Sequence, residues 1–177
     1  MKKLPVGVYA VSESFQEGTV IFTFKQETYE ATVGENAFCC LEELVLQTLL
    51  PAKEPFCGYS GIPVVLMVAG LCRIGNRGTT RETRFRTYFP CAAAILGENA
   101  GVSPNGEDLR IPAPRGEESV IEGSYYYGTI ALRGAVAGCM TIDGITLRTK
   151  IYDERIGGEN ASLVVKNCII ESPLSTI

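Results

Sequence analysis

Five arginines gather in one short stretch of the chain, and their type and spacing suit a binding role. Residues 73–86 hold one acid, Glu82, and these basic residues: Arg73, Arg77, Arg81, Arg84 and Arg86. Each guanidinium presents a planar fork of donors that matches phosphate or carboxylate. The stretch predicts a basic patch that binds nucleic acid or an acidic neighbouring subunit. The alternative is a solvated hairpin.

Tyrosines extend this candidate patch. Tyr88 follows the arginines, and Tyr125 and Tyr127 share one face of an expected strand because Tyr126 points the other way. Aromatic rings stack on nucleic-acid bases. We therefore add Tyr88, Tyr125 and Tyr127 to the patch. The alternative for the tyrosine run is an edge of the core with its hydroxyl groups in water.

The residue types that most catalytic sites need are absent or wrongly spaced. The chain has no histidine, which excludes Ser-His-Asp and Cys-His catalysis and His-containing metal sites within it. None of its seven cysteines forms a C-x2-C pair, so we expect no metal and no cofactor. The acid pairs Glu117-Glu118 and Asp153-Glu154 would face opposite ways in an extended chain. Carboxylate catalysis is the one alternative left open, and the balance of these observations favours a protein that is not an enzyme.

Composition and apolar runs bear on location. The net charge of −4 gives no whole-chain reason to expect nucleic acid or an acidic membrane. No signal peptide is recognisable after Lys2-Lys3, and the longest apolar run, residues 62–72, is about half of a membrane span. We expect an intracellular protein, cytoplasmic or part of a virion, with reduced thiols and no membrane contact. Cys39-Cys40 is either a reactive pair at a helix start or two small buried side chains.

An Asp-Gly turn organises the expected fold. Asp143-Gly144 lies between alternating apolar flanks, which is typical of a hairpin. In the outgoing strand, Ile145 and Leu147 share one face and Arg148 takes the other. With the turn at Gly157-Gly158, this pattern predicts three or four antiparallel strands.

The rest of the chain fits a single domain, residues 1–177. The expected elements are strands over residues 4–11, 19–25, 28–33 and 62–71, helices over residues 36–50 and 90–97, and an extended loop or arm over residues 98–118. The fold class predicted is mainly β, an antiparallel sandwich or barrel with two short α-helices.

One family resemblance accompanies this prediction. Asp143–Ile170 resembles the last two strands of bacterial single-stranded DNA-binding proteins of the OB-fold type, through the Leu147–Lys150 run, a glycine-rich acidic turn and a valine-rich final strand. The tryptophans and acidic tail of that family are missing here. The resemblance implies an OB-fold and single-stranded nucleic-acid binding.

Three functions follow as hypotheses. The first is a non-enzymatic structural or assembly protein, which self-associates as a homo-oligomer or joins other protein subunits in a larger particle such as a virion. The second is single-stranded nucleic-acid binding through the arginine cluster. The third is a β-barrel that binds a small apolar ligand.

Overall fold

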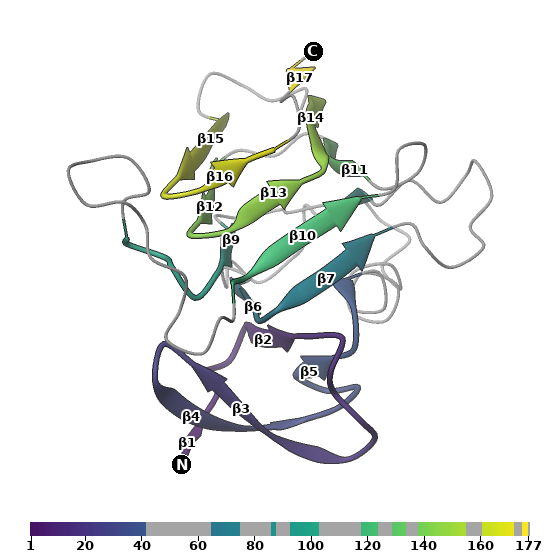
Figure 1. The fold of residues 1–177 in the computed structure, drawn as a ribbon, viewed down its shortest axis with the longest axis vertical. Coiled ribbons are helices and arrows are strands. Elements are labelled where there is room, and N and C mark those ends of the chain that lie inside the picture. Colours follow the sequence, from purple (N-terminus) through teal and green to yellow (C-terminus); the bar gives the residue numbers. More distant parts are fainter. Residues whose placement is uncertain are drawn as a thin grey trace.

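Parallel β-strands form most of the computed structural model, which is shown in Figure 1. The structure describes residues 1–41, 65–74, 86–87, 93–102, 118–123, 129–133, 138–154, 161–171 and 175–176. Seventeen strands lie in these ranges, and four sheets contain them.

Three of the four sheets are wholly parallel, and neighbouring strands in each come from distant parts of the chain. Sheet 1 has the order β5 (Ala37–Phe38), β2 (Val8–Val11), β6 (Val65–Val68), β9 (Ala93–Leu96), β12 (Gly138–Asp143), β15 (Ala161–Lys166). Sheet 2 has the order β7 (Leu71–Ile74), β10 (Val120–Gly123), β13 (Thr146–Arg148), β16 (Ile169–Ile170). Sheet 3 has the order β8 (Arg86–Thr87), β11 (Thr129–Arg133), β14 (Lys150–Glu154), β17 (Ser175–Thr176).

The chain winds through these sheets as a coil. Strands β6, β7 and β8 place one strand in each sheet, and the three following triplets repeat the path one level further along the stack. Such a succession of parallel coils is a β-helix, in which each coil contacts only its neighbours. The predicted antiparallel sandwich or barrel is therefore wrong. Alternating apolar residues indicate strands but do not indicate their direction of pairing, and here the pairing is parallel.

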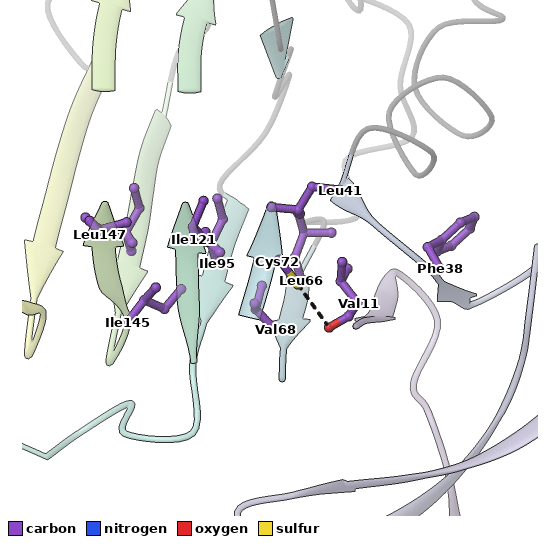
Figure 2. Close-up of a cluster of buried hydrophobic side chains, with 11 residues drawn as sticks. Val11, Phe38, Leu41, Leu66, Val68, Cys72, Ile95, Ile121, Ile145 and Leu147 are labelled. Atoms are coloured by element: carbon purple, nitrogen blue, oxygen red, sulfur yellow. Dashed lines mark hydrogen bonds between the residues drawn. The ribbon is translucent and has the colours of Figure 1, made fainter. Parts of the chain in front are cut away.

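In-register columns of apolar side chains fill the interior between sheets 1 and 2. In sheet 1, Leu66, Ile95 and Ile142 are register partners and are completely buried. Figure 2 shows Leu66 and Ile95 in one cluster with inward side chains of sheet 2, such as Cys72 and Ile121. Parallel strands stack the same inward position of each coil, so one buried residue in each coil builds a continuous core.

A hairpin covers the outside of sheet 1 near the N-terminus. Strands β3 (Thr19–Phe24) and β4 (Glu27–Thr32) pair antiparallel, which confirms the hairpin predicted from residues 19–25 and 28–33. Phe22 and Phe24 are buried and pack in one cluster with Met67 and Leu96 on the outer face of sheet 1. A two-residue strand, β1 (Lys2–Lys3), pairs parallel with β4. In the first coils, sheet 2 therefore covers the inner face of sheet 1 and the β3–β4 hairpin covers its outer face.

The Asp143-Gly144 turn is a corner of the coil. Gly144 has a φ of +72°, as the sequence signal requires, but β12 before it and β13 after it belong to different sheets. The predicted hairpin at this position is therefore wrong. The outgoing alternation is correct: Ile145 and Leu147 are fully buried and Arg148 is exposed.

The predicted helices differ from the described structure. Ala37–Phe38 is strand β5, so the helix predicted over residues 36–50 does not start at Asn36; Leu41 is helical, and residues 42–50 lie outside the described part. Ala93–Leu96 is strand β9 instead of a helix over residues 90–97. Ile95 fills the interior column there, and this tertiary contact outweighs the helix propensity of the alanines. Most of the expected arm, residues 103–117, also lies outside the described residues.

Candidate interaction surface

The structure places the backbone of two of the eight residues of the predicted basic and aromatic patch. Arg73 lies in β7 of sheet 2 and Arg86 in β8 of sheet 3. The other candidates lie outside the described residues: Arg77, Arg81, Arg84, Tyr88, Tyr125 and Tyr127. Residues 75–85 and 124–128 connect sheet 2 to sheet 3 in successive coils, and they begin after register partners, Ile74 and Gly123.

A column of alternating charges runs along the outer face of sheet 2. Its members are Glu13, Arg73, Glu122, Arg148 and Glu171, which we call the charge ladder. Arg73 Nη1 lies 3.1 Å from Glu13 Oε2, and Arg73 Nε lies 3.5 Å from Glu122 Oε2. Arg148 Nη1 lies 3.9 Å from Glu122 Oε1, and Arg148 Nε lies 2.5 Å from Glu171 Oε2. Each pair joins neighbouring levels of the stack.

The charge ladder accounts for Arg73 without any ligand. Two carboxylates, Glu13 and Glu122, face its guanidinium and offset its charge, which weakens the attraction of Arg73 for phosphate. At the other end, the hydrogen bond and charge of Glu171 raise the pKa of Arg148 above its ordinary value. Sequence analysis missed the ladder because its members meet only once the coils are stacked.

The N-terminal end of the stack is covered by the chain itself. Strands β2 and β5 extend sheet 1 beyond β6, and Phe38 and Leu41 are buried in the core at this end. At the edge of sheet 2, the Arg73 backbone N–H donates to Glu13 Oε1 at 2.5 Å. Terminal coverage of this kind is what repeat stacks need at their ends.

The C-terminal end is different. Strands β15, β16 and β17 are the last strands of their three sheets in the described part of the chain (Figure 1). Ile170 continues the inward column of Cys72, Ile121 and Leu147, which are all fully buried, yet it is 44% exposed. Val164 and Ile169 on the same coil are each 39% exposed. We call β15, β16, β17 and these side chains the open end.

Backbone groups at the open end are aligned to accept another strand. The N–H of Ile169 donates to the carbonyl of Ile145 at 3.1 Å, and that of Glu171 donates to the carbonyl of Leu147 at 2.9 Å. Successive amides of a strand point to opposite sides, so the N–H and C=O of Ile170 point away from β13. Within the described ranges, no strand lies on that side. An edge of this kind is a template for pairing with another chain.

Two carboxylates at the corner between sheets 1 and 2, the buried Asp143 and the half-buried Glu118, have a structural role. Asp143 Oδ1 accepts hydrogen bonds from Asn167 Nδ2 at 2.7 Å and from the Gly101 N–H at 3.1 Å. Glu118 accepts from Asn99 Nδ2 at 2.9 Å and from Thr146 Oγ1 at 2.8 Å.

These bonds join successive coils to the turn that follows β9. Because each carboxylate already accepts donors from its own chain, the corner is built for packing rather than for acid–base chemistry. None of these contacts was predicted, because the partners are far apart in sequence.

Four cysteines whose side chains the structure describes, Cys39, Cys40, Cys72 and Cys168, form no disulfide. Burial, and secondarily the charge of Glu13, raises the pKa of the Cys72 thiol from 9.0 to about 12, so Cys72 is unreactive at neutral pH. Cys39 and Cys40 lie in a bend directly after β5, and Cys40 is buried. Cys39 Sγ donates to the carbonyl of Phe15 at 3.3 Å. These contacts favour a packing role for the pair.

Comparison with known proteins does not name a family. No protein-family model, curated protein or solved structure matches the chain. Among the described residues, no cluster of three or more cysteine or acidic side chains has the arrangement of a metal site. The same part of the chain contains no helix whose length and apolar character would allow it to cross a membrane.

Proposed function

We propose that this chain is a non-enzymatic structural protein that joins other protein subunits through its open end. The observation that carries the proposal is the contrast between the two ends of the stack. One end is covered by β2, β5 and Glu13, and the other leaves Ile170, the last member of a buried column, partly exposed.

Physical chemistry favours a strand as the occupant of the open end. A paired strand would satisfy the backbone groups of Ile170 and cover its side chain in one step. Fully burying an isoleucine side chain is worth roughly 1.5–3 kcal/mol. Ile170 is 44% exposed, so covering the rest of its side chain would contribute roughly 1 kcal/mol. Edge pairing of this kind is a common mode of protein recognition.

The other hypotheses receive less support. Both barrel-based functions, the OB-fold and the apolar-ligand barrel, require an antiparallel barrel, and the sheets here are parallel. Arg73, the one arginine of the candidate patch whose side chain is described, is balanced by two glutamates. No observation therefore favours a second function.

The test uses a peptide as a surrogate partner strand. The peptide has the sequence of residues 145–151, ITLRTKI, which already forms the level next to β16 in the fold. It is titrated into the ¹⁵N-labelled full chain, and amide chemical shifts are followed. We expect saturable shifts centred on Ile170 and Glu171.

Two variants of one residue separate edge pairing from side-chain contact. Ile170→Pro removes both the side chain and the outward N–H, whereas Ile170→Ala removes only the side chain. Because this N–H faces away from β13, both variants should fold, which far-UV circular dichroism checks. We expect Ile170→Ala to bind more weakly and Ile170→Pro not to bind. Absence of shifts at the open end up to millimolar peptide, or equal binding by both variants, would overturn the proposal.

A further inference from the structure

Sheet 2 follows a simple rule from coil to coil. At equivalent register positions, each strand places an apolar residue inward and the next residue, a charged one, outward. The four pairs along the stack are Cys72-Arg73, Ile121-Glu122, Leu147-Arg148 and Ile170-Glu171.

The sign of the outward charge alternates along the stack. Arg73 lies between Glu13 and Glu122, and Arg148 lies between Glu122 and Glu171. Glu122 has a basic neighbour on each side, whereas Glu171 has a ladder partner, Arg148, on one side. The next position of the ladder, beyond Glu171, lies at the open end.

We propose that the open end takes a strand of a partner protein that carries an apolar residue followed by arginine or lysine, paired parallel to β16. This inference rests on the proposed function and specifies the partner. The apolar residue would continue the column that ends at Ile170. The basic residue would lie beside Glu171, as Arg148 does on the opposite side. Such cross-strand pairs of opposite charge stabilise a sheet, and like charges oppose it.

The charge ladder also favours a different chain over a second copy of this one. Its other end is Glu13, so head-to-tail stacking of two copies would bring Glu13 toward Glu171. That end is, in addition, already covered by β2 and β5 at sheet 1 and by Glu13 at sheet 2. A second copy therefore offers acid where the ladder requires a base.

The test compares two peptides that differ in one charge. The first is ITLRTKI, and the second carries the substitution equivalent to Arg148→Glu. With the full-length chain, we expect the glutamate peptide to bind about 2- to 30-fold more weakly, because an opposite-charge contact becomes a like-charge one. The difference should shrink at 1 M salt.

Two protein variants assign this difference to Glu171. In Glu171→Gln, the preference for the arginine peptide should be largely lost. In Glu30→Gln, which removes one exposed charge from β4, the preference should persist. Equal loss in both variants would mean that overall charge, rather than the ladder, sets the preference, and would overturn the inference.

The possible outcomes distinguish failure of this inference from failure of the proposed joining function. Binding of both peptides with equal affinity would overturn the basic-partner inference and leave the open end as a joining surface. Absence of binding would overturn both. Light scattering that shows a homo-oligomer dissociated by Ile170→Pro would support the joining function but contradict the choice of a different chain.

Discussion

The corner at Gly144 leaves no room for a side chain, and replacing Gly144 should be severely destabilising. A Cβ added at Gly144 would lie 1.9 Å from the Ala100 backbone nitrogen and 2.1 Å from the Asn99 carbonyl carbon. Both atoms are backbone, so no side-chain rotation relieves the overlap. Gly97 meets the same corner from the other side, since a Cβ there would lie 2.2 Å from the Gly144 carbonyl oxygen.

The cost of Gly144→Ala has two parts. Alanine at a φ of +72° loses roughly 1–2 kcal/mol for the left-handed backbone. Forcing Asn99 and Ala100 away adds about 1–3 kcal/mol of overpacking. Together these lower the free energy of unfolding by about 2–5 kcal/mol, which corresponds to a fall in Tm of roughly 4–20 °C for a chain of this size.

Gly70 provides the matched control. It lies at the equivalent corner of an earlier coil, between β6 and β7, and has a φ of +63°. A Cβ at Gly70 would meet nothing within 4 Å. Gly70→Ala should therefore show only the backbone cost of roughly 1–2 kcal/mol.

Urea unfolding of both variants, followed by circular dichroism, measures the difference. If Gly144→Ala is no more destabilising than Gly70→Ala, the close packing of this corner against residues 99–100 is refuted.

Three further predictions concern the hairpin, a buried thiol and the charge ladder. Phe22→Ala should lower the free energy of unfolding by about 3–5 kcal/mol, whereas Ile21→Ala, on the exposed face of the same strand, should change it by less than about 0.5 kcal/mol; similar losses would contradict the hairpin packing. Above pH 9, the unfolded chain releases the Cys72 proton while the folded chain keeps it up to about pH 12, so stability should fall by about 1.4 kcal/mol per pH unit from this group. Urea titrations of wild type and Cys72→Ala across this range check the slope, and equal slopes would refute the assignment. Glu122→Gln should lower Tm by about 2–4 °C at most, and only at low salt; a loss that persists at 1 M salt would mean that the effect is not ionic.

Local features of the fold could be predicted from the sequence. The β3–β4 hairpin joins residues close in the chain, and its period of two places Phe22 and Phe24 inward without reference to any other element. The positive φ at Gly144 and the burial of Ile145 and Leu147 also follow from local chemistry.

The parallel stacking could not be predicted in the same way. An Asp-Gly turn with φ > 0 suits a hairpin and a coil corner equally well. The register partners Leu66, Ile95, Ile142 and Val165 are unevenly spaced along the chain because connections of different length separate the coils. No constant sequence period therefore exposed the repeat.

The candidate site likewise combines a feature that the sequence reveals with contacts that only the stacked coils create. A cluster of arginines is visible in sequence, but its meaning depends on what lies beside each one. Arg73 was expected to meet a ligand or a neighbouring subunit, and it meets Glu13 and Glu122 of its own chain. The open end had no sequence signal, because Ile170 has the same apolar character as the buried residues of its column and differs from them only in its exposure.

The covered N-terminal end also bears on the order in which the coils fold. Because β2, β5 and the β3–β4 hairpin precede the coils in the chain, they are synthesised before them, and each later coil can pair with strands already made. We therefore expect the coils to form in order from this end, each new strand pairing with the edge of the previous coil. Within the described residues, the open end has such an unpaired edge, so the proposed partner strand would pair with β16 as β16 pairs with β13.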